Sequence, residues 1–266
     1  MSGGAFDSMA AGYDEEFTNT QIGRLQRDKV WSYLDSTFLF NQDFRVFELN
    51  CGTGEDAIRF AQRGCRVVAT DISPEMINVA RGKAEKAGVS DRIEFKTLDI
   101  SKAESADFEG QFNLVFSNFG GLNCVSSETL QSLRKVFAGY LSPNGRFVSV
   151  VMPSACMMES LYFLSRFQFN EAFRRRKKKV EWKNDKGALL MIHYFAPKEF
   201  SVQFENSFTS ESLLPIGLWI PPSYTEAFFH RHRKTLNALS GLENRFSPSF
   251  LAGISDHYLI DLKLKN

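Results

Sequence analysis

Two acidic side chains and a glycine-bearing bend between them have types and spacing that suit ligand chemistry. Glu48 ends a short apolar run, and Gly52 and Gly54 follow it just before residues 55–63, which have helical spacing. A helix that starts there presents unpaired N–H groups and the positive end of its dipole to a ligand. Asp71 ends a second apolar run nineteen residues after Gly52, where a carboxylate can accept hydrogen bonds from both ribose hydroxyls. The pattern predicts a site for a nucleoside-containing cofactor.

The bend also fits the dinucleotide spacing G-x-G-x-x-A, through Gly52, Gly54 and Ala57. Taken alone, that spacing also occurs in turns that bind nothing. Three features favour a different cofactor. The bend follows about 45 residues of mostly helical sequence, Asp99 closes a third strand-like run where it can accept from an adenine amine, and no further strand–helix repeats follow Gly145. A nicotinamide-dependent oxidoreductase remains the first alternative.

Several segments together resemble the class I S-adenosylmethionine-dependent methyltransferases that act on small molecules. They are residues 48–54 (ELNCGTG), 71–76 (DISPEM), 98–100 (LDI) and 141–147 (LSPNGRF), with the opening 5–14 (AFDSMAAGYD). The resemblance covers residues 5–152 well and 197–266 by topology only. It implies S-adenosyl-L-methionine as the cofactor and a methyltransferase activity.

The resemblance also implies which residues hold each part of the cofactor. Asp71 would hold the ribose, and Ile72 would pack on the adenine. Asp99 and Ile100 would flank the adenine edge. The residues implied at the methionine end are Glu48 with Gly52 and Gly54, Tyr13 over the carboxylate, and Ser117 and Asn118 near the sulfonium.

Asn50 departs from the family pattern, which usually has glycine at this position. Asparagine tolerates left-handed backbone angles better than other non-glycine residues, so the bend can still form. Its side chain is expected to crowd or contact the cofactor. We interpret Asn50 as a variant that keeps binding. A cofactor-binding relative without catalysis is the second alternative.

Strand and helix patterns alternate five times and place these residues at strand ends. The predicted strands are 45–49, 66–70, 93–97, 112–116 and 146–151, followed by 203–214 and 256–264. Such alternation predicts an α/β fold with a mainly parallel sheet and helices on both faces. The ligand is then expected at the carboxyl ends of the strands, where the strand order reverses. The resemblance implies a Rossmann-like, seven-stranded sheet whose last strand pairs antiparallel.

Residues 153–195 interrupt this alternation and are predicted to form an inserted cap. A helical stretch at 154–180, rich in Phe and Met, ends in six cations at 174–179, and strands 179–183 and 188–195 flank a turn at 184–187. The basic run is most simply a solvated helix end; an anionic substrate, a lipid headgroup or a nucleic acid are the other partners considered. The predicted units are residues 1–152 (N-terminal helices and core), 153–195 (cap) and 196–266 (completion of the core sheet).

Composition limits the other classes of function. The chain has 266 residues, 43% of them hydrophobic, and a net charge of +1, so nucleic acid is an unlikely partner. It lacks the features of a signal peptide and any apolar run of about 20 residues, so we expect a cytoplasmic protein without a membrane span. The four cysteines stand singly, and His230 and His232 lie two apart on a predicted helix, which indicates no metal site.

Methyl transfer from a sulfonium is an in-line displacement with a neutral thioether as leaving group. The protein must align the reacting atoms and exclude water, and it needs a base only if the nucleophile must lose a proton. The sequence indicates no definite catalytic residue; His193, Tyr194, Tyr224 and His257 are candidates by type alone. The expected acceptor is a small molecule that is apolar or anionic, and the oligomeric state is left open.

Overall fold

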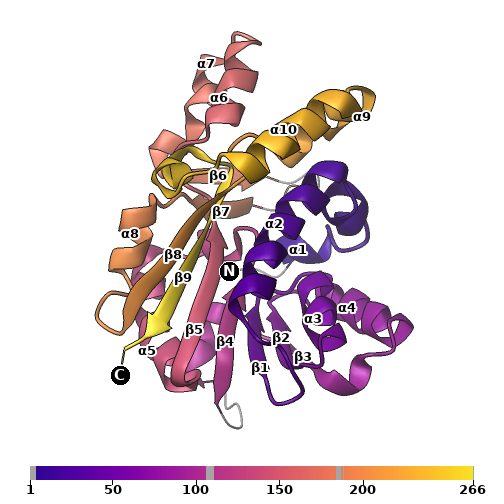
Figure 1. Ribbon diagram of the computed structural model, residues 1–266, viewed down its shortest axis with the longest axis vertical. Helices are drawn as coiled ribbons and strands as arrows, with labels where there is room; N and C mark the ends of the chain where they lie inside the picture. Colours follow the sequence, from indigo (N-terminus) through magenta and orange to yellow (C-terminus); the bar gives the residue numbers. More distant parts are fainter. Residues whose placement is uncertain (1–3, 106–110, 184–186, 188, 266) are drawn as a thin grey trace.

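Seven strands form one sheet in the order β3-β2-β1-β4-β5-β9-β8 in the computed structural model, which describes residues 4–105, 111–183, 187 and 189–265 (Figure 1). The strands are β1 (Arg45–Leu49), β2 (Arg66–Asp71), β3 (Ile93–Thr97), β4 (Phe112–Ser117), β5 (Leu141–Val151), β8 (Phe208–Ile216) and β9 (His257–Leu264). Strands β1 to β5 are parallel, whereas β9 runs antiparallel to both β5 and β8. The predicted Rossmann-like α/β fold is confirmed.

Helices cover both faces of this sheet. They are α1 (Gly4–Asp7), α2 (Gln21–Thr37), α3 (Glu55–Gln62), α4 (Pro74–Lys86), α5 (Ser127–Tyr140), α8 (Pro197–Val202), α9 (Glu226–Arg231) and α10 (Arg233–Arg245), with a π-helical turn at Asp14–Thr18. Helices α2, α3 and α4 pack in one buried cluster, and α5 and α8 pack in another. Within β1, Val46 belongs to the first cluster and Phe47 to the second, because alternate side chains of a strand face opposite sides.

Local capping explains where the helices begin and where the sequence prediction needs correction. Ser73 caps α4 by accepting from the Met76 N–H at 3.1 Å, as its position before Pro74 predicts. Helix α5 begins at Ser127 and is capped by Ser126, whose side chain accepts from the Thr129 N–H. The single helix predicted around His230 and His232 is instead two helices, since the backbone leaves helical geometry at His232 between α9 and α10.

The inserted segment forms its own elements outside the main sheet. They are α6 (Met157–Leu164), α7 (Phe169–Ala172), a 3₁₀ turn at Arg174–Lys177, and the antiparallel pair β6 (Lys179–Lys183) and β7 (Leu189–His193). The helix predicted over 154–180 is therefore broken, and of the predicted turn 184–187 only Gly187 lies within the described residues. Helices α6 and α7 project from the upper end of the molecule (Figure 1). The division into units at 152 and 195 stays a prediction.

No helix among the described residues has both the length and the apolar character needed to cross a bilayer.

Candidate active site

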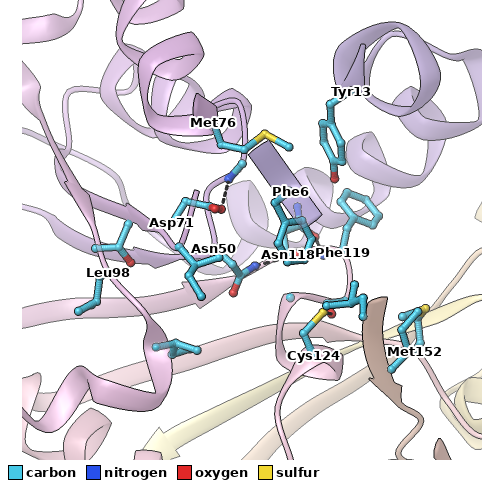
Figure 2. A pocket seen from close by; sticks show the side chains of 18 residues that line it. Phe6, Tyr13, Asn50, Asp71, Met76, Leu98, Asn118, Phe119, Cys124 and Met152 are labelled. Carbon is cyan, nitrogen blue, oxygen red and sulfur yellow. Dashed lines mark hydrogen bonds between the residues drawn. The ribbon is translucent and has the colours of Figure 1, made fainter. Parts of the chain in front are cut away.

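A cavity of about 220 Å³ lies at the carboxyl ends of the parallel strands, where the order reverses between β1 and β4. Side chains from both halves of the chain surround it (Figure 2). Its lining is Phe6, Tyr13, Asn50, Gly52, Thr70, Asp71, Ile72, Met76, Leu98, Ile100, Asn118, Phe119, Gly120, Gly121, Cys124, Met152, Leu190 and Ile192. This is the edge at which open α/β sheets bind ligands.

The cavity brings together most of the residues that the sequence assigned to a cofactor. Those that line it are Tyr13, Asn50, Gly52, Asp71, Ile72, Ile100 and Asn118. Glu48 lines a smaller cavity that shares Tyr13, Asn50 and Gly52 with the first. Gly54, Asp99 and Ser117 line neither. The Asp99 carboxylate accepts from the Ser101 N–H and hydroxyl at 3.0 and 2.7 Å, so it is engaged within its own turn.

Asp71 braces the glycine bend from the end of β2. One carboxylate oxygen accepts from the Gly52 N–H at 2.9 Å, and the other accepts from the Ser73 N–H at the same distance. Burial raises the pKa of Asp71, although the backbone N–H groups of Ser73 and Gly52 oppose that rise. The side chain lies at the cavity wall (Figure 2). It joins the bend and the start of α4, the two backbone segments that would surround a ribose.

Gly54 is needed for packing at the start of α3. Its φ is +79°, and a Cβ built on it would lie 2.7 Å from the Ala80 Cβ in α4. Left-handed angles and such close approach both require glycine. Gly54 therefore lets α3 pack close to α4 and has no direct place in the cavity wall.

Asn50 adopts the left-handed conformation that the sequence predicts, with a φ of +45°. Its side chain is turned toward the end of β4, where its Oδ1 accepts from the Ser117 hydroxyl at 3.0 Å and its Nδ2 donates to the Asn118 carbonyl at 3.4 Å. A Cβ at Gly121 would collide with this carboxamide. The side chain of Asn50 therefore requires a residue without a Cβ at position 121. The sequence analysis did not identify Gly121 as part of the site.

An ionic group missed by the sequence analysis lies in the smaller cavity. Arg27 of α2 pairs with Asp56 of α3, which also accepts from the Trp31 indole at 2.7 Å and from the Asn118 amide at 2.9 Å. Burial raises the pKa of Asp56, but the Arg27 charge and these hydrogen bonds outweigh it and lower that pKa. The only signal of this pair in the sequence was the charge of Arg27 within the mostly helical residues that precede the bend.

Glu48 is buried next to this pair, and its Oε2 has no hydrogen-bond partner among the described residues. Burial raises its pKa well above the ordinary value of 4.5, and the Asp56 charge adds to the rise. A buried acceptor without a partner is costly unless a ligand satisfies it. The small cavity therefore offers an unsatisfied carboxyl group near a guanidinium, which suits the amino and carboxylate groups of an amino acid.

The N-terminal segment is fastened over the bend by polar contacts. Thr53 donates to Asp14 at 2.6 Å, Lys83 donates to the same carboxylate at 2.7 Å, and Ser73 donates to Asp7 at 2.5 Å. These contacts hold the segment that carries Tyr13, a residue that lines both cavities. Figure 2 shows its side chain at the larger one. Burial raises the pKa of Tyr13 to about 12, so its phenol stays protonated near neutral pH.

The other end of the cavity is apolar. It is formed by Phe119, Gly120, Gly121 and Cys124 after β4, Met152 after β5, and Leu190 and Ile192 of β7. Asn123 holds these parts together: its Nδ2 donates to the Met152 and His193 carbonyls at 3.1 and 2.5 Å. Burial raises the pKa of Cys124 to about 12, so its thiol is not a nucleophile near neutral pH.

The candidate bases lie outside this wall. The described lining residues include no His, Lys, Arg or Glu, and none of His193, Tyr194, Tyr224 and His257 is among them. His257 reaches the site only indirectly, edge-on to the Phe119 ring. Among the described residues no group of three His, Cys, Asp or Glu side chains is placed to hold a metal ion.

The basic run is only partly solvated, which corrects the simplest sequence interpretation. Arg174 and Arg175 both donate to the buried Glu159 carboxylate, with distances from 2.9 to 3.1 Å. Arg175 also pairs with Asp256 at 2.7 Å, next to β9. These two cations tie the inserted segment to the core, while residues 176–179 face solvent.

Part of this chain is similar in sequence to known methyltransferases. Residues 46–145 match the family model described as a methyltransferase domain. The tRNA 5-carboxymethoxyuridine methyltransferase of Escherichia coli (strain K12) is 35% identical over 92 residues, 34% of this chain and 35% of that protein. The ubiquinone/menaquinone biosynthesis C-methyltransferase UbiE of Bartonella henselae is 28% identical over 178 residues, 63% of this chain and 64% of that protein.

A solved structure extends the likeness to the whole fold. The DhpI–SAH complex aligns with a TM-score of 0.59 and 14% identity, covering 99% of this chain and 95% of that one. The curated relatives are matched more narrowly, since the chain spans about a third of the length of the first of them.

Proposed function

We propose that the protein is a class I S-adenosylmethionine-dependent methyltransferase that transfers the methyl group of S-adenosylmethionine to a small apolar acceptor; the match of residues 46–145 to a methyltransferase-domain family model supports this. The single observation that carries the proposal is the two-ended cavity. Asp71, Gly52 and the adjoining Glu48 form a polar end, and Cys124, Met152 and Ile192 form an apolar end.

We assign the adenosine to the part of the cavity next to β2 and β3. Asp71 and the N–H groups around it lie where a ribose would bind, and Ile72, Leu98 and Ile100 offer flat apolar contacts for an adenine. Asp99 is a weaker candidate than the resemblance implies, because it is not among the residues that line the cavity. These assignments rest on lining and hydrogen bonding, and they extend the predicted set by Leu98.

The methionine end belongs in the smaller cavity. Glu48 would accept from the ammonium group, and Arg27 would face the carboxylate, with Tyr13 closing the space above them. The unsatisfied Glu48 Oε2 supports this assignment, since an ammonium would supply its missing donor. Asn118 lines both cavities and so lies where the sulfonium would join them.

The chain's own residues act mainly by positioning. S-adenosylmethionine supplies the electrophilic methyl group when bound. Tyr13, Asn118 and Phe119 border the junction between the two ends and would set the approach of the acceptor to that methyl group. Orientation and water exclusion account for large rate effects without a protein base. The described lining residues include no side chain of a type that usually titrates near pH 7. An acceptor that must lose a proton would therefore have to be acidic enough to ionise without a protein base.

The acceptor is expected to be apolar more than anionic. The described lining holds no cation, whereas an anionic group in an apolar wall requires a paired charge. The UbiE relative is named for methylation at carbon in ubiquinone and menaquinone biosynthesis, which is compatible with such a wall. The inserted segment 153–195 would act as a cap, because β7 supplies Leu190 and Ile192. A cytoplasmic location stays a prediction.

The test has two stages. Isothermal titration should detect binding of S-adenosylhomocysteine but not of NADH, and Asp71→Ala should weaken the former. A panel of phenols, enolic ketones and prenylated compounds is then offered with radiolabelled S-adenosylmethionine. Binding of NADH alone would favour the oxidoreductase, binding without transfer would favour a non-catalytic relative, and transfer to tRNA alone would exclude a small-molecule acceptor.

A further inference from the structure

The α6–α7 protrusion, residues 157–177, displays large apolar side chains to solvent. It projects beyond the helices that cover the sheet, at the end of the molecule opposite the C-terminus (Figure 1). Leu161, Phe167, Phe169 and Phe173 are 55%, 82%, 60% and 42% exposed. Clustered exposure of this kind marks an interaction site more often than a neutral surface.

Phe167 adopts a left-handed backbone conformation in the turn that ends α6. Its φ is +58°, in the left-handed region, where a bulky side chain is strained. The Phe167 N–H donates to the Leu164 carbonyl at 3.0 Å and the Gln168 N–H donates to the Phe163 carbonyl at 2.9 Å, so the residue ends α6 at a position usually occupied by glycine. The fold therefore accepts strain at this turn while exposing the ring.

The charge around these rings is strongly one-sided. Within residues 157–177 the exposed charged side chains are Arg166, Arg176 and Lys177 against the single carboxylate of Glu171; of the two lysines that follow, Lys178 pairs with Glu199 of α8. The whole chain carries only +1. The protrusion is thus a local basic and apolar surface on a nearly neutral protein.

The protrusion is also held firmly to the body of the molecule. Glu159 of α6 accepts from Arg174 and Arg175, and Arg175 continues to Asp256 beside β9 at 2.7 Å. Tyr224 adds a hydrogen bond to Glu159 at 3.3 Å. This network fastens α6 and the turn after α7 to the core of the protein.

We propose that the α6–α7 protrusion docks the protein on an anionic lipid surface. Phe167 and Phe169 would enter the boundary between headgroups and acyl chains, and Arg176 and Lys177 would face lipid phosphates. Interfacial segments combine apolar rings with Lys and Arg in this way, and anionic lipids attract such basic clusters. A second copy of the chain would bring the exposed cations of both copies together, which like-charge repulsion opposes.

Docking at a membrane also fits the apolar end of the cavity. The chain continues from the protrusion into β6 and β7, and Leu190 and Ile192 of β7 line that end. A lipophilic acceptor would then reach the cavity from the surface on which the protein rests. The docking itself does not depend on the proposed methyl transfer.

The experiment is co-sedimentation of the full chain with vesicles of phosphatidylcholine alone or of phosphatidylcholine with phosphatidylglycerol. The wild type should bind the anionic vesicles, and added salt should weaken binding. The double variant R176E/K177E should bind at least about tenfold more weakly. Its matched control is K86E/K135E, which changes the net charge equally at exposed positions of α4 and α5.

Phe167→Gly separates docking from folding, because glycine relieves the left-handed strain. It should leave the urea midpoint equal or higher and S-adenosylhomocysteine binding unchanged, yet weaken vesicle binding several-fold. Phe250→Ser, at a ring 79% exposed elsewhere, is its control and should bind vesicles as the wild type does. Equal binding to both vesicle types, equal losses in the control variants, a dimer that Phe167→Gly dissolves without any vesicle binding, or retention of tRNA instead of vesicles would each overturn the proposal.

Discussion

The two ends of the cavity are built in different ways. At the cofactor end, backbone N–H groups and buried carboxylates meet: Asp71 receives two N–H bonds, and Glu48 lies unsatisfied near Arg27. At the acceptor end, side chains such as Met152 and Ile192 provide apolar surface. In the proposed function, the first end would recognise a ligand by direction and charge, and the second would recognise it by shape.

This contrast has an energetic consequence. A buried polar group that loses its partner costs its full desolvation, so changes at the cofactor end should be abrupt. An apolar wall loses stabilisation in proportion to the area removed from contact, so changes at the acceptor end should be graded. Substitutions at the two ends of the cavity should reveal this difference, and the largest effect is expected at Asp71.

Replacing Asp71 should affect cofactor binding most. Asp71→Ala frees the Gly52 and Ser73 N–H groups and removes the acceptor proposed for the ribose. We expect S-adenosylhomocysteine affinity to fall on the order of 100-fold, about 3 kcal/mol, as measured by calorimetry. Asp91→Ala, at an exposed carboxylate, is the control. Unchanged affinity in Asp71→Ala would remove this residue from the site.

Gly54→Ala should destabilise the fold beneath the cofactor end. The new Cβ would meet Ala80 at 2.7 Å in a left-handed backbone. We expect the free energy of unfolding in urea to fall by about 2 kcal/mol.

Gly82→Ala is the matched control for this change. Gly82 lies in α4 with nothing within 4 Å of an added Cβ, so alanine there should stabilise the helix by about 0.8 kcal/mol. Equal effects of the two substitutions would contradict the close-packing role of Gly54.

The pKa of Glu48 gives a pH dependence that distinguishes the two ends. Its pKa is raised in the folded protein by burial, so the stability that protonated Glu48 contributes is complete below its ordinary value of 4.5 and is lost as pH rises through the folded pKa. Relative to Glu48→Gln, the cofactor-free wild type should lose stability in urea unfolding as the pH rises above about 4.5. S-adenosylhomocysteine should reduce the loss, because its ammonium favours the carboxylate. Parallel pH curves for the two proteins would contradict the raised pKa.

Trimming the acceptor wall should have the smallest and most selective effect. Ile192→Ala removes apolar surface from the cavity, so KM for an apolar acceptor should rise roughly threefold to tenfold with cofactor affinity unchanged. Met191→Ala, next to it on β7 but outside the lining, should leave KM unchanged. A loss of cofactor affinity in Ile192→Ala would show that the two ends are not separate.

The sequence by itself predicted the sheet, its parallel strands and the cofactor end. These follow from local signals: apolar runs that end in Glu48 and Asp71, and a glycine bend before a helix. In a parallel sheet the carboxyl ends of the strands lie at one edge. Residues that end successive strands in the sequence therefore lie close together in space. The left-handed conformation of Asn50 was also predictable, because it depends on the residue type.

Only the tertiary structure decided the apolar end of the cavity and the charges that line the smaller cavity. Phe119, Met152 and Ile192 come from three separate segments, and Arg27 meets Asp56 across 29 positions of the sequence. No periodicity signals such pairs, because they form only when helices and the inserted segment pack on the sheet. The residues at the strand ends and the glycine bend can be identified from neighbouring positions in the sequence. The shape of the apolar end of the cavity depends instead on how distant elements pack.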